Sequence, residues 1–152
     1  MRHRPLAPAV MIVRGGVDVA APAARAYDLY ADYRNWPALF PAINAVRETG
    51  RDGDAVELAI EHREGSVTNR LRLEPPARIV VTERKRRYDA EFVNTFRDTP
   101  TGSRYEVVGE VRLRGWLRPL APIIRPYARR QLRRLTLAPM KAAAEARRGG
   151  PE

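Results

Sequence analysis

The fold is decided by residues 55–113, which read AVELAIEHREGSVTNRLRLEPPARIVVTERKRRYDAEFVNTFRDTPTGSRYEVVGEVRL. Apolar and polar side chains alternate through this stretch in short runs, as in Val56, Glu57 and Leu58. An alternation of this period is typical of antiparallel strands with one face in the core and the other in water. The stretch therefore predicts a meander of antiparallel strands.

Turn residues divide the meander, because Gly, Pro and Asp interrupt regular strand pairing. Three such turns are Gly50 to Asp54, Pro75-Pro76 and Asp98 to Gly102. Two more strands, 10–19 and 43–49, precede residues 55–113. The predicted strands are 10–19, 43–49, 55–63, 67–73, 78–88 and 89–97, with a last strand after Gly102.

Two short helices are predicted between the first two strands. Pro22 suits the first turn of a helix, and Ala23 to Tyr33 supplies good helix formers. Asn35 can cap a second short helix, which Pro41 ends.

A long helix is predicted after the meander, from about Pro122 to about Arg147. Pro139 lies well inside it and is expected to kink or break it. Arginines such as Arg130 and Arg134 lie mostly off its apolar stripe. The predicted stripe consists of Leu120, Ile124, Tyr127, Leu135, Ala138 and Ala142.

Together these elements predict an α+β fold, in which about seven antiparallel strands wrap around the C-terminal helix. A sheet wrapped in this way encloses space between strands and helix, which indicates a container for an apolar small molecule. We expect one domain over residues 10–148, with tails at 1–9 and 149–152.

The chain is strongly basic, with 28 Lys and Arg against 18 Asp and Glu and a net charge of +10. The basic residues are spread over all predicted elements and do not interleave with aromatics, so nucleic acid is not an expected partner. A basic helix face around residues 129–134 leaves weak contact with an anionic membrane open. We expect a monomer or a homodimer.

The absence of cysteine excludes disulfides, thiol catalysis and zinc–thiolate sites, and makes the cytoplasm the expected location. The basic and then apolar N-terminus suggests a signal peptide. Pro5 and Pro8 interrupt it, however, and its apolar part runs into the first strand, so we reject that interpretation.

Few residues could carry out catalysis. The histidines are His3 and His62, and the serines Ser66 and Ser103 lie at turns without a neighbouring base. The sequence contains no Gly-rich phosphate loop and no dinucleotide motif. It therefore predicts no cofactor and no metal, and it argues against hydrolases, kinases and dehydrogenases.

Five polar residues fall on the apolar face of the predicted sheet: His62, Asn69, Glu83, Asn94 and Tyr105. A buried polar group without a partner costs about 1–3 kcal/mol. These side chains should therefore pair with one another, or line a cavity and orient an apolar ligand. Glu83 and His62 are candidate catalytic residues, Glu83 first, because a carboxyl removed from water can exchange protons near neutrality.

Trp36 and Phe40 bracket a Pro-rich turn that should cover the opening of the sheet. They could close the core or form a wall of the cavity. The predicted ligand pocket consists of Tyr30, Trp36, Phe40, Leu58, Ile60, His62, Asn69, Leu71, Val81, Glu83, Phe92, Asn94, Tyr105, Val107, Ile124 and Tyr127.

Two segments carry a resemblance to a known family: Val17 to Pro22 (VDVAAP) and Tyr33 to Pro41 (YRNWPALFP). With them the sequence resembles the START-like (SRPBCC) helix-grip superfamily, in its polyketide cyclase/dehydrase and lipid-transport branch. The resemblance implies a seven-stranded sheet that grips the last helix over a hydrophobic cavity. For aromatase/cyclases, the resemblance also implies a pocket arginine on a middle strand. The residue at the corresponding position of this sequence is Arg72. The alternation instead places Arg72 on the polar face with Thr68 and Arg70.

Three functions follow as hypotheses. The first is binding or carriage of a hydrophobic small molecule, such as a lipid, an isoprenoid or a polyketide-like compound. The second is a polyketide aromatase/cyclase or dehydratase that uses acid and base residues of the pocket. The third is a peripheral membrane or partner-binding module that uses the basic C-terminal helix.

Overall fold

The computed structural model describes residues 9–63 and 65–146. Within them, seven strands form one antiparallel sheet in the order β1-β7-β6-β5-β4-β3-β2, which confirms the predicted meander. The predicted tails, 1–9 and 149–152, lie outside these residues apart from Ala9, which begins β1. The strands are β1 (Ala9–Val19), β2 (Ile43–Asp52), β3 (Ala55–His62), β4 (Gly65–Glu74), β5 (Arg78–Arg84), β6 (Tyr88–Thr99) and β7 (Gly102–Leu113).

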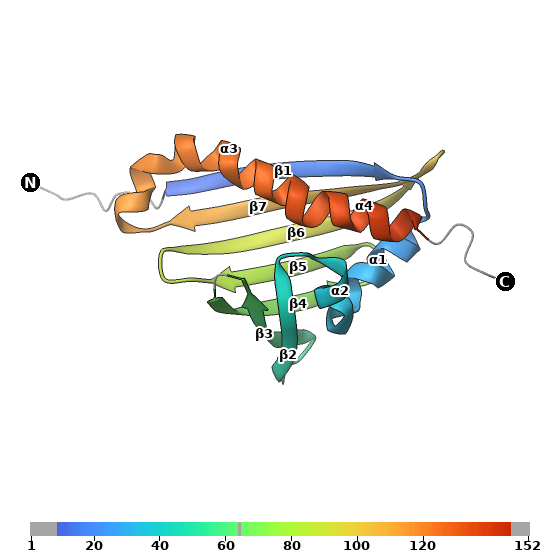
Figure 1. The fold of residues 1–152 in the computed structure, drawn as a ribbon, viewed down its shortest axis with the longest axis horizontal. Coiled ribbons are helices and arrows are strands. Elements are labelled where there is room, and N and C mark those ends of the chain that lie inside the picture. The colour runs from blue at the N-terminus through green and yellow to red at the C-terminus, as the bar shows by residue number, and fades with distance from the viewer. Residues whose placement is uncertain (1–8, 64, 147–152) are drawn as a thin grey trace, which may run out of the picture.

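The helices cover one face of this sheet (Figure 1). The C-terminal helix runs across the sheet beside β1 and β7. The two short helices lie near the C-terminal end of this long helix. The expected helix-grip fold is thus observed. The helical segments are α1 (Ala23–Ala31), η1 (Tyr33–Asn35), α2 (Trp36–Leu39), η2 (Gly115–Leu120), α3 (Ala121–Leu132), η3 (Arg133–Leu137) and α4 (Ala138–Glu145).

An aromatic cluster fills the interior at the end of the sheet nearest α1. Tyr30 packs edge-on against Trp36 and Phe40, with ring centroids 5.5 and 5.7 Å apart. Beside it, Phe96 stacks on Tyr105 at 4.8 Å. Aromatic pairs in such geometries are worth about 0.5–1.5 kcal/mol beyond the area they bury. This end of the interior is therefore solid core.

The predicted apolar stripe of the C-terminal helix is wrong in its second half, because Ala138 and Ala142 are exposed. The helix changes to π geometry over η3, directly before the turn that contains Pro139. A π turn holds more residues than an α turn, so the inward positions shift along the sequence. The predicted interruption near Pro139 is confirmed. The buried positions in this half are Leu137, Met140 and Ala144.

Two strand ends differ from prediction by three residues or more. β2 continues to Asp52, with shifts in its pairing with β3. The predicted strand 78–88 ends at Arg84, because the N–H of Lys85 donates to the carbonyl of Tyr88 at 2.9 Å and closes a tight turn. This turn brings Lys85 and Tyr88 to the edge of the sheet interior.

Replacing Asp98 with alanine should lower the free energy of unfolding by about 1 kcal/mol. Helix α1 follows Pro22, whose side chain has no hydrogen-bond acceptor, and the backbone N–H of Ala23 instead donates to Oδ1 of Asp98 at 2.9 Å. Asp98 thus caps the helix from the end of β6. Urea unfolding measures the effect, and Asp98→Asn, which keeps an acceptor oxygen, should retain most of the stability. Equal stability of the alanine variant and the wild type would contradict this role.

Candidate functional site: an apolar cavity under the C-terminal helix

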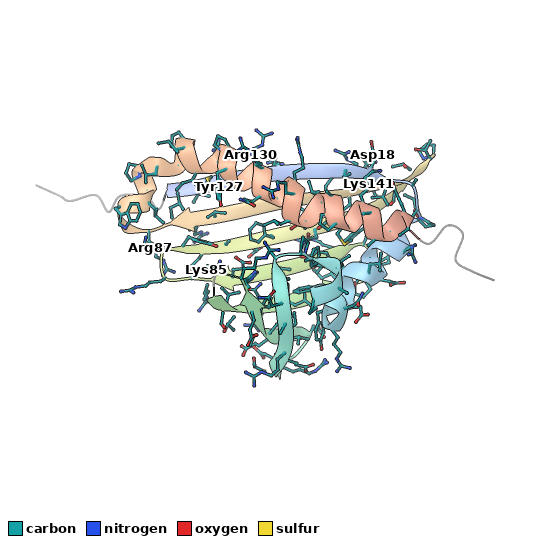
Figure 2. The ribbon with its side chains drawn as sticks, viewed as in Figure 1. Asp18, Lys85, Arg87, Tyr127, Arg130 and Lys141 are labelled. Carbon is teal, nitrogen blue, oxygen red and sulfur yellow. The ribbon has the colours of Figure 1, made fainter. Side chains whose placement is uncertain are left out.

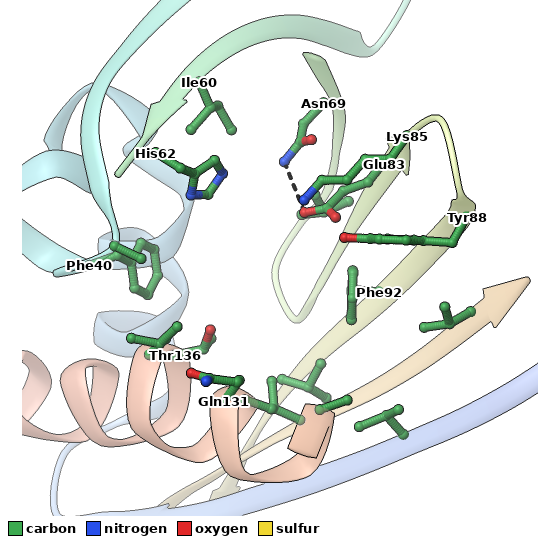
Figure 3. A pocket seen from close by; sticks show the side chains of 18 of the residues that line it. Phe40, Ile60, His62, Asn69, Glu83, Lys85, Tyr88, Phe92, Gln131 and Thr136 are labelled. Carbon is green, nitrogen blue, oxygen red and sulfur yellow. Dashed lines mark hydrogen bonds between the residues drawn. The ribbon is translucent and has the colours of Figure 1, made fainter. Parts of the chain in front are cut away.

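The rest of the interior contains a cavity of about 470 Å³ between the sheet and the C-terminal helix. Pockets for small molecules commonly measure about 300–1,000 Å³. Strands β1, β5, β6 and β7 form its floor, and α3 forms its roof (Figure 3). The apolar part of the wall includes Met11, Val13, Ile60, Val81, Phe92, Val107, Val111, Leu113, Ile124 and Leu132.

Most of the residues predicted for the ligand pocket lie on this wall. Their role in ligand binding stays a prediction, because lining a cavity is a geometric property. The predicted residues that line the cavity are Tyr30, Trp36, Phe40, Ile60, His62, Asn69, Val81, Glu83, Phe92, Asn94, Val107, Ile124 and Tyr127.

Three predicted pocket residues, Leu58, Leu71 and Tyr105, are completely buried and do not line the cavity. They face the interior as the alternation requires. They belong to the same buried cluster as Ala26, Tyr27 and Leu39 of the two short helices. These three residues therefore form core around the cavity.

Polar side chains gather at one side of the cavity, where β4, β5 and β6 meet (Figure 3). Nδ2 of Asn69 donates to Oε1 of Glu83 at 3.4 Å, and Nζ of Lys85 lies 5.2 Å from the centroid of the Tyr88 ring. Burial and the charge of Glu83 raise the pKa of Tyr88, while Lys85 opposes this effect. Tyr88 is therefore a protonated hydrogen-bond donor at neutral pH.

Two buried polar atoms on the wall, Nε2 of His62 and Oδ1 of Asn69, make no hydrogen bond within the described part of the chain. His62 lies at the end of β3, and Glu83 lies on β5, with β4 and its Asn69 between them (Figure 3). A polar group on a bound molecule could satisfy either atom, and doing so would recover part of its desolvation cost.

A second polar group lies deeper, beside the aromatic cluster. The hydroxyl of Tyr105 donates to Oδ1 of Asn94 at 2.7 Å, and Nδ2 of Asn94 donates to the carbonyl of Ile79 at 3.2 Å. Burial raises the pKa of Tyr105 and of Tyr30, and the charge of Glu83 raises that of Tyr30 further. Both phenols therefore stay protonated at neutral pH.

Arg72 is exposed and does not line the cavity. It pairs with Ala55 and Val80 across β4, while its neighbour Leu71 points inward and is buried. The position that the family resemblance implied for a pocket arginine is therefore wrong here, and the position derived from the alternation is correct.

Several lining residues were missed by the sequence analysis, for different reasons. Met11, Val13, Val111 and Leu113 lie on apolar strand faces, so the alternation contained the signal for them. Leu135 lies on the predicted helix stripe and Ile43 begins a predicted strand, but neither was assigned to the pocket. The others depended on turns or on helix positions outside that stripe, which alternation does not report. These are Ala42, Lys85, Tyr88, Leu117, Ala128, Gln131, Leu132 and Thr136.

The described residues contain neither a metal-binding cluster nor a helix that could span a membrane. Over residues 9–63 and 65–146, no group of three or more His, Asp or Glu side chains could hold a metal ion. None of the helices in these ranges is both long enough and apolar enough to cross a membrane.

Comparison with known proteins supports the fold and identifies the family. A family model described as "Polyketide cyclase / dehydrase and lipid transport" matches residues 11–145. No curated protein matches the chain. Among solved structures, the Zhui aromatase/cyclase from Streptomyces sp. R1128 has a TM-score of 0.75 at 15% identity, over 94% of this chain and 99% of that one. A START superfamily protein from Mycobacterium smegmatis has a TM-score of 0.70 at 18% identity, over 88% and 97%.

The di-domain ARO/CYC StfQ from the steffimycin biosynthetic pathway has a TM-score of 0.77 at 19% identity, over 93% of this chain and 52% of that one. The chain thus spans about half the length of StfQ, and likewise of the di-domain ARO/CYC BexL. At these identities the likeness shows the fold alone. The family model, in contrast, covers most of the sequence, and the chain therefore belongs to the polyketide cyclase/dehydrase and lipid transport family.

Proposed function

We propose that the protein binds or carries a hydrophobic small molecule, such as a lipid, an isoprenoid or a polyketide-like compound, in the cavity under its C-terminal helix. The observation that supports this proposal is the cavity itself, with its largely apolar wall and a few polar side chains grouped at one side. This combination is typical of small-molecule sites, where apolar contacts give affinity and a few polar groups set orientation.

The size and the wall of the cavity also support occupancy by a ligand. The cavity is open to water through the turns near Lys85 and Tyr88, so water can enter it against a largely apolar wall. A ligand that replaced this water would gain about 25 cal/mol for each Å² of apolar surface buried.

Titration with a neutral apolar fluorophore, N-phenyl-1-naphthylamine, tests the proposal. Its emission should rise on binding with one-to-one stoichiometry, and long-chain lipids or fused-ring aromatics should displace it. Native mass spectrometry of protein purified from its source should show an adduct of small-molecule mass. Failure of the probe and of all these compounds to bind would refute the proposal.

Polyketide aromatase/cyclase or dehydratase activity is a second candidate. Specific support comes from Glu83 on β5 and His62 on β3, which line the same apolar cavity and could take part in proton transfer to a bound substrate. The fold shared with the Zhui and StfQ proteins is consistent with it. A cytoplasmic location and independence of cofactors stay predictions.

Glu83→Gln should reduce turnover of an aromatic polyketide substrate by about 100-fold or more if Glu83 is the acid or base. His62→Ala tests the second residue in the same assay. Glu57→Gln, at an exposed position of β3, is the matched control and should leave turnover unchanged. Unchanged turnover in both cavity variants, with thermal unfolding also unchanged, would exclude these roles.

A further inference from the structure

The cavity continues into an open vestibule, and the two share Ala42, His62, Lys85, Tyr88, Tyr127, Gln131 and Leu135. The vestibule lies between the β3–β4 turn, the β5–β6 turn and the C-terminal helix. Figure 2 shows Lys85 and Arg87 at the β5–β6 turn, with Tyr127 on the helix above them. A molecule in the cavity would therefore have one end in this vestibule.

The vestibule wall is cationic. Among the described residues that form it, none is an aspartate or glutamate. Glu64, between Arg63 and Gly65, lies outside the described residues. The basic residues of the wall are Arg63, Arg84, Lys85, Arg86, Arg87 and Arg134.

Most of these basic side chains also have no carboxylate paired with them among the described residues. Elsewhere on the surface, arginines pair with carboxylates, as in Arg70 with Asp52 at 2.6 Å and Arg78 with Glu74 at 2.9 Å. Over residues 9–63 and 65–146, no carboxylate pairs with the vestibule arginines. Arg87 instead stacks over Trp116, with its Cζ atom 5.1 Å from the centroid of the ring. Like charges held together in a concave site make a positive potential that an anion would neutralise.

We infer that the ligand is an anionic amphiphile, whose apolar body fills the cavity and whose carboxylate or phosphate head lies among the vestibule arginines. This inference rests on the proposed function and names the ligand class. Guanidinium groups form strong, charge-assisted hydrogen bonds with both kinds of head.

Glu83 fixes the direction in which such a ligand enters. Its carboxylate lies inside the cavity, next to Asn69 and beside Lys85 (Figure 3). An anionic head that passed Glu83 would leave water and meet a like charge, which are both unfavourable. The apolar end of the ligand therefore enters first, and the head stays in the vestibule.

Affinities for three compounds with the same dodecyl chain test the inference: dodecanoate, dodecan-1-ol and dodecyltrimethylammonium, all below their micelle concentrations. We expect dodecanoate to displace the neutral fluorophore at a concentration about tenfold lower than the alcohol, and the cation to bind most weakly. Raising NaCl from about 0.1 to about 1 M should remove most of this preference.

The variant Arg84→Gln/Arg86→Gln/Arg134→Gln should weaken dodecanoate binding about tenfold and leave the alcohol unchanged. The control Arg14→Gln/Arg47→Gln/Arg72→Gln removes the same charge at positions away from the vestibule, and should change neither affinity. Equal affinities of wild-type protein for dodecanoate and the alcohol would overturn the inference and leave the proposed function standing. Failure of the neutral fluorophore to bind, together with all three compounds and the lipids and fused-ring aromatics named above, would instead refute the proposed function.

Vesicles of phosphatidylglycerol and phosphatidylcholine distinguish a bound amphiphile from a bilayer surface. If the vestibule variant stops sedimenting with these vesicles while its affinity for dodecanoate is unchanged, the arginines face a membrane and the inference is overturned. If its dodecanoate affinity falls, the arginines contact the head of the bound molecule as inferred.

Discussion

Replacing Val81 with tryptophan is expected to raise the dissociation constant for N-phenyl-1-naphthylamine at least about 30-fold, or about 2 kcal/mol. Val81 lies on the central strand β5, pairs with Phe92 of β6 and Leu71 of β4, and is 4% exposed. Its side chain points into the cavity, so an indole there would occupy space that the probe needs. Apolar surface of the probe that can no longer be buried weakens its binding by about 25 cal/mol per Å².

The control for this variant is Val80→Trp. Val80 is the preceding residue of β5, is half-buried and faces away from the cavity. The two variants carry the same added side chain on the same strand, so general effects of tryptophan on the sheet should be common to both. Isothermal titration measures binding, and urea unfolding shows that each variant folds. Wild-type affinity in Val81→Trp would mean that the probe binds elsewhere.

The strands and the side of the sheet that faces inward could be predicted from the sequence, because period-two alternation reports directly which residues avoid water. Val81, Phe92 and Val107 were assigned correctly to the inner face for this reason. Alternation does not report what lies opposite each residue. Leu58, Ile60 and Leu71 all belong to one buried cluster, but of these three only Ile60 also lines the cavity.

The helix and turn contributions to the cavity could not be predicted from periodicity. Thr136 reaches the wall from η3, where the helix changes to π geometry, and a 3.6-residue stripe assumes no such change. Gln131 lies in α3 before this change, and an apolar stripe omits it because it is polar. The basic residues 84–87 give no sequence signal of an inward-facing side chain. The tight turn closed by the Lys85 N–H and the Tyr88 carbonyl nevertheless brings Tyr88 and Lys85 to the cavity.

The two buried phenols should make the protein sensitive to alkaline pH. Burial raises the pKa of both Tyr105 and Tyr30 above the ordinary value of about 10, which applies in the unfolded chain. Between that value and the higher folded values, the folded state holds protons that the unfolded state has released. The associated stability is therefore fully present below about pH 10 and is lost as the pH rises through the folded values, by up to about 1.4 kcal/mol per pH unit for each phenol.

Tyr105→Phe separates the two contributions of this hydroxyl. At neutral pH the variant should be less stable by about 1–3 kcal/mol, because Oδ1 of Asn94 loses the buried donor that lies 2.7 Å away. Above pH 10 its stability should fall less steeply than that of the wild type, by about 1.4 kcal/mol per pH unit, since one proton fewer is linked to folding. Urea unfolding at a series of pH values measures both effects.

Tyr127→Phe controls for the general loss of a phenol hydroxyl, since Tyr127 is 60% exposed. It should leave the free energy of unfolding at neutral pH within about 0.5 kcal/mol of wild type. If Tyr105→Phe and wild type lose stability equally steeply above pH 10, then the Tyr105 phenol ionises without unfolding the chain. Water would then reach the Asn94 pair through the cavity, and the deep end of the site would be wet rather than sealed by the aromatic cluster.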